Sequence, residues 1–171
     1  MNKLTRLITG LVIVLLFFSC ATNNVDGRYY ERTGGYSIRL PETWSVVEFP
    51  GLKYKVIVGP VENDFRLSIN FVDENFAGQL DGYIDASLEA VSNIHGFTLV
   101  QRGEFVTLNN LKGERVEIGV FQNNRNIRLI FYFFPGKGDK KLVVTAGVPS
   151  EVADSYYETF DEIIKTFVWI K

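Results

Sequence analysis

The chain has 171 residues, 46% of them hydrophobic and 22% charged, and a formal net charge of −2 at pH 7. This composition is typical of one ordinary globular domain and excludes a disordered or fibrous chain. Because Lys3 and Arg6 precede position 20 and every acidic residue follows it, removing residues 1–19 changes the charge from −2 to −4. A net-acidic domain without a basic run is not expected to bind nucleic acid, since phosphate contacts require clustered Lys and Arg.

The first residues have the architecture of a secretion signal. Lys3 and Arg6 supply positive charge, and an apolar run over 7–18 ends at Ser19 and Cys20. A membrane-spanning helix needs about twenty apolar residues, so this run is too short to favour permanent spanning. We therefore predict that residues 1–19 are a signal peptide, cleaved between Ser19 and Cys20.

Residues 16–20 (Leu-Phe-Phe-Ser-Cys) resemble the lipobox of bacterial lipoproteins, in which a small residue precedes an invariant cysteine. Phe17 and Phe18 depart from the usual aliphatic-then-small pattern and are similar to the relaxed boxes of spirochaetes. The resemblance implies that Cys20 receives a diacylglyceryl group and that its freed amine receives a further acyl chain such as palmitate. Two or more chains hold a protein stably on a membrane. The alternative is that Cys20 stands incidentally beside an ordinary signal-peptidase site.

The lone cysteine also bears on the fold and on location. Cys20 has no partner for a disulfide, so the exported domain must be held by its own core. The lipobox resemblance implies a lipid-anchored protein of the bacterial cell envelope. Ala21 is not the aspartate that retains enterobacterial lipoproteins at the inner membrane, which favours the periplasmic side of the outer membrane.

Residues 20–35 are poor in apolar side chains and rich in Asn, Gly and charge. This composition predicts a tether between the lipid and a globular domain over 36–171. Tyr29 and Tyr30 are exceptions within it. We expect them to pack on the edge of the domain rather than contact a ligand.

Beyond Gly35, apolar residues alternate with polar ones at the period typical of strands with one exposed face. The predicted strands are 36–40, 44–49, 54–58, 65–71, 97–108 and 111–121, with Asn109-Asn110 as a hairpin turn between the last two. Segments 127–134 and 142–148 are apolar on both faces, so we expect them in the middle of the sheet. The Gly-x-Gly of their connection, residues 135–139, could approach a phosphate, but a plain hairpin turn is favoured.

Two segments have helical periodicity. One runs from about 81 to 94, with Asp81 as its cap and Gly96 as its stop, and the other from about 151 to 167. An antiparallel sheet with a helix on each face would cover all of these apolar surfaces. The predicted fold class is therefore α+β, an α/β/α sandwich.

Residues 36–44 (Tyr-Ser-Ile-Arg-Leu-Pro-Glu-Thr-Trp) and the closing helix before Phe167 and Trp169 resemble the PsbP-like α/β/α sandwich. The resemblance covers roughly 36–171, and the aromatic-Ser-Ile-x-x-Pro-x-x-Trp segment carries most of it. Characterised members are mostly non-catalytic: some stabilise a photosynthetic metal-cluster complex at a membrane, and another binds a small GTPase. The resemblance implies a binding or accessory role rather than an enzyme.

No catalytic constellation stands out. The anchor uses Cys20, and no Gly-x-Ser-x-Gly elbow is present. The one histidine, His95, falls at the predicted end of the first helix, where it would cap the last carbonyls rather than act as a base or metal ligand. We therefore predict no catalytic residue, no metal ligand and no cofactor.

Two acidic rows, each on one helix face, are the remaining candidates for chemistry. One comprises Asp81, Asp85 and Glu89, and the other Asp154, Glu158 and Asp161. Carboxylates in a row along one helix are too linear to enclose a cation unaided, so we expect solvated faces. A hydrolase with paired carboxylates is the third functional hypothesis.

Aromatic residues suggest a possible partner surface. Its candidates are Tyr132, Phe134, Tyr156 and Tyr157, although the filling of a two-sided core is the favoured interpretation of these residues. The main hypothesis is a lipid-anchored, non-catalytic binding or accessory domain for a membrane-associated protein partner, whose effective concentration the anchor raises. The alternative is a carrier of a small hydrophobic ligand, which would require a continuous apolar cavity of roughly several hundred Å³.

Overall fold

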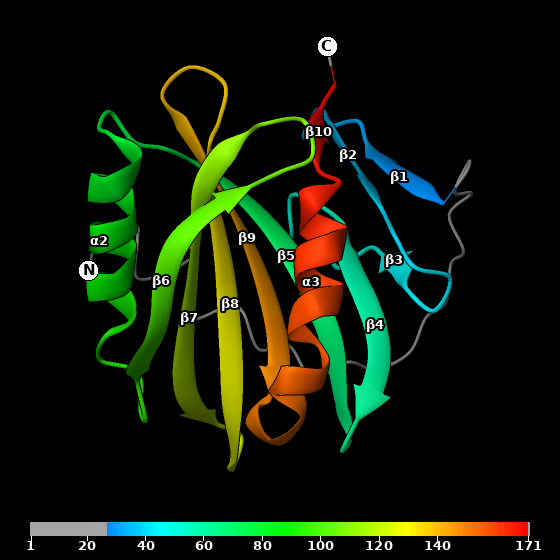
Figure 1. The fold of residues 1–171 in the computed structure, drawn as a ribbon, viewed down its shortest axis with the longest axis vertical. Coiled ribbons are helices and arrows are strands. Elements are labelled where there is room, and N and C mark those ends of the chain that lie inside the picture. Colours follow the sequence, from blue (N-terminus) through cyan, green and yellow to red (C-terminus); the bar gives the residue numbers. More distant parts are fainter. Residues whose placement is uncertain (1–26, 171) are drawn as a thin grey trace.

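The computed structural model describes residues 27–170, so Ser19, Cys20 and the predicted signal peptide lie outside the described residues (Figure 1). The described chain forms a seven-stranded sheet, a three-stranded sheet and helices. In chain order the elements are β1 (Arg28–Glu31), β2 (Tyr36–Arg39), β3 (Ser45–Val47), β4 (Val56–Glu62), β5 (Phe65–Asn75), α2 (Leu80–Val91), β6 (Thr98–Val106), β7 (Lys112–Gln122), β8 (Arg125–Pro135), β9 (Lys140–Pro149), the 3₁₀-helix η1 (Ser150–Ser155), α3 (Tyr157–Lys165) and β10 (Val168–Trp169).

The large sheet has the strand order β3-β4-β5-β9-β8-β7-β6, and all its neighbours are antiparallel. Strands β9 and β8 are the fourth and fifth in this order, which confirms the expectation that 127–134 and 142–148 lie mid-sheet. The hairpin between them is also confirmed, with the Gly136 N–H donating to the Lys140 carbonyl over 2.9 Å. A central strand is covered on both faces, which is why both segments are apolar throughout.

Alternate residues of β8 enter two different cores. Ile130, Tyr132 and Phe134 join the cluster that includes α3 and the three-stranded sheet β1-β2-β10. Leu129, Phe131 and Phe133 join the cluster that includes α2, on the opposite face. In Figure 1, α3 crosses the front of the sheet and α2 stands at its left. The predicted α+β fold, a sheet with helices on both faces, is confirmed.

The folded domain begins before the predicted boundary at residue 36. Strand β1 pairs with β2 over four residues, and Tyr29 is 6% exposed. The Tyr29 hydroxyl donates to the carboxylate of Glu31 over 2.5 Å, so both inward-facing residues of β1 are satisfied. The expected packing of Tyr29 is confirmed, whereas Tyr30 is exposed. The described part of the predicted tether is thus largely an edge strand whose pattern of two inward residues was too short to recognise.

The two predicted helices are both present but shorter. The second is divided into η1 and α3, and the chain then turns back so that β10 pairs with β2. The first ends at Val91, where the Ser92 hydroxyl donates to the Glu89 carbonyl. His95 lies beyond this end, its ring 5.3 Å from that of Phe121, so the prediction that it caps the helix is wrong.

Candidate functional site

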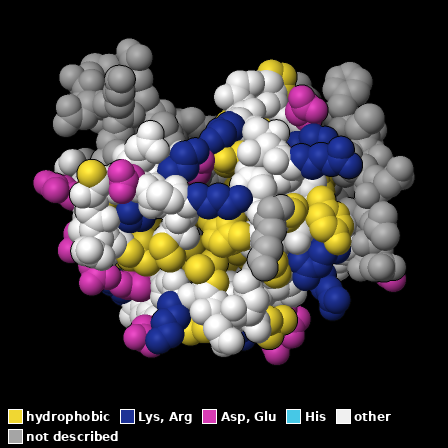
Figure 2. All heavy atoms as spheres, turned by 90° about the horizontal axis from the view of Figure 1, so that it is seen from above, with side chains coloured by type: hydrophobic (Ala, Val, Ile, Leu, Met, Phe, Trp, Pro, Cys, Tyr) yellow, Lys and Arg dark blue, Asp and Glu magenta, His cyan; other side chains and the backbone are white. Residues whose placement is uncertain are grey.

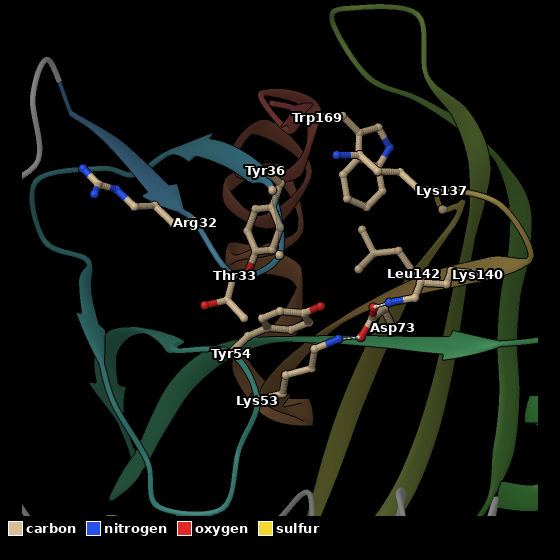
Figure 3. Close-up of a pocket in the computed structure, with 13 residues that line it drawn as sticks. Arg32, Thr33, Tyr36, Lys53, Tyr54, Asp73, Lys137, Lys140, Leu142 and Trp169 are labelled. Atoms are coloured by element: carbon tan, nitrogen blue, oxygen red, sulfur yellow. Dashed lines mark hydrogen bonds and ion pairs between the residues drawn. The ribbon is translucent and has the colours of Figure 1, made fainter. Parts of the chain in front are cut away.

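A pocket of about 330 Å³ opens between the three-stranded sheet and the β8–β9 turn (Figure 3). It is built from five stretches of chain: the β1–β2 turn and the start of β2, the segment before β4, strand β5, the β8–β9 hairpin, and β10. Its lining residues are Arg32, Thr33, Gly34, Gly35, Tyr36, Lys53, Tyr54, Asp73, Gly136, Lys137, Lys140, Leu142 and Trp169.

Two glycines in the β1–β2 turn hold one side of the pocket in its shape. Gly35 has a φ of +65°, a conformation that residues with a side chain rarely adopt. A Cβ atom on Gly34 would lie 2.5 Å from a ring carbon of Tyr36 and 3.1 Å from one of Tyr54. The absence of a side chain at Gly34 thus lets the turn approach the two tyrosine rings, and glycine at Gly35 suits the backbone conformation of the turn.

Aromatic side chains form the inner wall. The Tyr36 ring stacks on Phe71 with centroids 4.6 Å apart and meets the Tyr54 ring edge-on at 5.9 Å. Trp169 packs edge-on against Phe167 at 5.0 Å. In Figure 3 the Tyr36 ring extends from β2 toward Thr33 and Tyr54. These contacts fix the rings through packing in the core that lies behind the pocket.

The hydroxyl of Tyr36 is the unusual group of this wall. The residue is fully buried, and its hydroxyl oxygen has no hydrogen-bond partner within residues 27–170. Burial, followed by the negative charge of Glu31, raises the pKa of Tyr36. The hydroxyl is thus protonated at neutral pH and can donate a hydrogen bond.

Lysine side chains form the outer part. Lys53 and Lys140 each donate to one carboxylate oxygen of Asp73, and the Lys140 Nζ–Asp73 Oδ2 distance is 2.7 Å (Figure 3). Burial alone would raise the pKa of Asp73, but the hydrogen bonds from Lys140 and Lys53 lower it to about 2. Asp73 is therefore ionised at neutral pH and holds two ammonium groups at the pocket.

Two further cations belong to the lining. The Lys137 ammonium lies 5.8 Å from the Trp169 ring centroid and donates to the Ile170 carbonyl over 3.3 Å. The Arg32 side chain extends away from the other labelled residues in Figure 3. Four cationic residues and one acidic residue thus line the pocket, although the whole chain has a net charge of −2. Seen from this end, Lys and Arg side chains stand beside a band of apolar ones (Figure 2).

The four aromatic residues considered as a possible partner surface lie in the core or are partly buried. Tyr132 and Phe134 are fully buried in the core under α3, so the favoured two-sided core is confirmed for them and their possible place on a partner surface is wrong. The Tyr132 hydroxyl donates to Asp161 over 2.6 Å, which draws the ring toward the helix. Tyr156 and Tyr157 are partly buried, and their hydroxyls donate to Glu62 and Glu117. Burial and the bond to Glu117 raise the pKa of Tyr157 to about 12.

The two acidic rows lie apart. Asp85 is exposed and pairs with Arg102, while Asp161 accepts from Arg115 and Tyr132 at the sheet. No group of three or more His, Cys, Asp or Glu residues with metal-binding geometry occurs within residues 27–170. The helices that carry the rows cover opposite faces of the sheet, so the rows do not converge on one cleft.

An exposed apolar edge was missed by the sequence analysis. Strand β6 ends the large sheet, and of its residues only Phe105 is buried. Leu99, Val100 and Val106 are each more than 40% exposed, and Leu108, just beyond the strand, is 76% exposed. Two successive apolar residues, Leu99 and Val100, break the alternation of the strand. This local break, together with a second one at Phe105 and Val106, was the signal in the sequence.

The geometry above is that of an α+β sandwich, and comparison with solved structures shows that its fold is PsbP-like. Over 89% of this chain and 98% of the other, it is similar to cyanobacterial PsbP (CyanoP) from Synechocystis, with 15% identity and a TM-score of 0.60. The similarity to LpqN, involved in cell envelope biogenesis of Mycobacterium tuberculosis, covers 78% and 82%, with 13% identity and a TM-score of 0.60. The Ran-binding protein Mog1p of Saccharomyces cerevisiae is matched over 84% and 95%, at 11% identity and a TM-score of 0.55.

At these identities the likeness concerns the fold alone. By sequence, the chain matches no protein family model and no curated protein. Within residues 27–170, none of the helices has the length and apolar character required to cross a membrane.

Proposed function

We propose that this protein is a lipid-anchored, non-catalytic binding protein of a bacterial cell envelope, and that it serves as an accessory domain for a membrane-associated protein. The observation that carries this proposal is the exposed apolar edge of β6. The fold likeness to LpqN, an envelope biogenesis protein, and to the Ran-binding Mog1p supports a role of this kind.

The β6 edge fits an extended segment of a partner protein. An edge strand presents unpaired backbone N–H and C=O groups that can pair with another strand. Within the described residues, no strand pairs with the outer side of β6. Leu99 and Val100 stand near one end and Val106 and Leu108 at the other, so an added strand would contact apolar side chains at both ends of the edge. Arg102 is ion-paired with Asp85 and Glu114, so the middle of the edge is charged and hydrated.

The anchor places this edge near its partner. Acyl chains on Cys20 would confine the domain to a thin layer at the membrane and raise its effective concentration toward membrane proteins without any new contact. The outer membrane, on its periplasmic side, is the location that we propose, because Ala21 is not an inner-membrane retention residue.

Replacing Cys20 tests the anchor. The Cys20→Ser chain has no thiol for the diacylglyceryl group, so we expect it in the soluble fraction, whereas the unchanged chain sediments with membranes. Cell fractionation followed by immunoblotting measures the distribution, and mass spectrometry of the N-terminal peptide detects the acyl chains. A Cys20→Ser chain that remains membrane-bound would contradict the anchoring proposal.

A charge placed on the β6 edge tests the docking surface. The double variant Leu99→Lys/Val106→Lys should lower recovery of the partner at least about tenfold in cross-linking and affinity purification, because each lysine must be desolvated on binding. Leu99 and Val106 are 48% and 41% exposed, so the stability of the domain should change by no more than about 0.5 kcal/mol per site.

A matched control uses two exposed apolar residues elsewhere. Leu52 and Val61 are 42% and 51% exposed, and the variant Leu52→Lys/Val61→Lys should recover the partner as the unchanged chain does. Hydrogen exchange with the purified partner should show new amide protection confined to residues 98–106. Equal recovery by both double variants, or protection elsewhere, would show that β6 is not the docking edge.

A carrier of a wholly hydrophobic ligand is not favoured. The pocket of about 330 Å³ has four cationic residues and Asp73 in its lining and is not the continuous apolar cavity that this alternative requires.

A further inference from the structure

We propose that the pocket binds a small organic anion, in which a carboxylate or phosphate group is attached to a flat apolar ring. This ligand site lies apart from the β6 edge and goes beyond the accessory function. The first argument is the hydroxyl of Tyr36. Removing a hydroxyl from water without giving it a partner costs free energy, so a buried unpaired hydroxyl beside a pocket indicates a ligand group that accepts from it.

Other tyrosines of the same chain show that this hydroxyl is an exception. Five tyrosine hydroxyls each donate to a carboxylate, over distances between 2.5 and 2.6 Å: Tyr29 to Glu31, Tyr83 to Glu74, Tyr132 to Asp161, Tyr156 to Glu62 and Tyr157 to Glu117. Five of the eight tyrosines thus donate their hydroxyl proton to a carboxylate, and Tyr36 is the one whose hydroxyl is buried without a partner within residues 27–170. By the same chemistry, the missing acceptor of Tyr36 is an anionic oxygen supplied by a ligand.

The lysines give the pocket its excess of positive charge. Each ammonium group has three hydrogens to donate, and Asp73 accepts one hydrogen bond from Lys53 and one from Lys140. Both lysines are about half exposed, so their remaining hydrogens are available at the opening. Asp73 thus positions two cations while neutralising one, and Lys137 adds a further cation. A cation or a wholly apolar ligand would be disfavoured by this excess of positive charge.

The aromatic wall and the volume limit the rest of the ligand. Trp169 lines the pocket and is only partly buried, so it can present ring surface to a flat apolar group. Tyr54 is 6% exposed, with the Lys53 ammonium over its ring, and closes the wall behind it. The volume of about 330 Å³ lies at the lower end of the range for small-molecule sites. A single ring with one anionic group therefore fits the site better than a nucleotide or a whole lipid.

Binding can be measured on the purified full chain by fluorescence titration, because Trp169 lines the pocket, and by calorimetry. The complete probes are phenyl phosphate and benzoate. Inorganic phosphate, which lacks the ring, and phenol, which lacks the anionic group, are the controls. We expect saturable binding of phenyl phosphate or benzoate and at least about tenfold weaker binding of both halves. Absence of saturable binding of either complete probe up to about 10 mM would overturn the proposal.

Three variants test whether the probe binds in the pocket. Tyr36→Phe keeps the stacked ring and removes only the hydroxyl, so affinity should fall at least about tenfold while the melting temperature stays equal or rises. Lys140→Met should weaken binding by a similar factor, whereas the control Lys112→Met, which makes the same charge change on an exposed residue of β7 outside the pocket, should stay within about twofold. Unchanged affinity in a folded Tyr36→Phe protein would overturn the proposal.

A phosphate group could come from a free metabolite or from a lipid headgroup. Vesicles of phosphatidylglycerol added to the phenyl phosphate complex separate the two sources. Displacement of the probe would show that a headgroup phosphate without a ring is sufficient and would overturn the ring part of the proposal, whereas retention of the probe supports a free small anion. Binding of the probe requires neither Cys20 nor β6. The absence of probe binding would therefore overturn the ligand proposal and leave the proposed accessory function intact.

Discussion

Asp73 shows how one carboxylate organises the candidate pocket. It is only 10% exposed, yet two ammonium groups donate to it and lower its pKa to about 2. In the unfolded chain its pKa would be near the ordinary value of 3.8. A carboxylate whose pKa is lower in the folded state stabilises the fold above the unfolded pKa, and this contribution is lost as the pH falls.

The contribution of Asp73 to stability should therefore disappear between about pH 4 and pH 2. We expect this contribution to be about 1 to 2 kcal/mol, because Lys53 is half exposed and solvent screens its ion pair with Asp73. Urea unfolding at a series of pH values, compared between the unchanged chain and Asp73→Asn, measures it. The two curves should differ at pH 7 and converge near pH 2. An Asp73→Asn difference that is constant across this range would show that ionisation of Asp73 does not support the fold.

At the scale of elements, the sequence predicted the strands and helices that are long enough to show a periodic pattern of apolar residues. The eight strand segments, both helices and the central position of 127–134 follow from alternation and from apolar faces, and the structure has them. The elements that were missed are short. Strand β1 has two inward residues, and β10 has two residues in all, which is too few for a period to be recognised.

The candidate pocket could not be predicted for a different reason. Its residues come from five segments between Arg32 and Trp169, and only the fold brings them together. Gly34 and Gly35 were read as part of a tether, although their lack of side chains lets the turn approach two tyrosine rings. Tyr36 lies in a segment that was correctly predicted as a strand. No local pattern reveals that its hydroxyl lacks a partner, because that depends on every neighbour at once.

At the scale of the whole molecule, one strand joins two cores. Strand β8 sends alternate side chains to the α3 face and to the α2 face, so loss of packing in either cluster leaves one face of this central strand exposed. Phe160 on α3 and Ile84 on α2 are fully buried on opposite faces. Because both cores share the central strands, we expect the described domain to unfold in a single cooperative transition.

Core truncations on either face test this coupling. Phe160→Ala and Ile84→Ala should each destabilise the domain by about 3 kcal/mol, through lost burial and the cavity left behind, while Leu108→Ala, at an exposed site, should have little effect. Trp44 lies edge-on to Phe160, so its fluorescence reports the α3 face, while hydrogen exchange of residues 80–91 reports α2. If the faces are coupled, Ile84→Ala shifts the tryptophan transition as far as it shifts protection in α2. Loss of protection in α2 alone, with the tryptophan transition unmoved, would mean that α2 unfolds as a separate unit and that the sheet and α3 form the cooperative core.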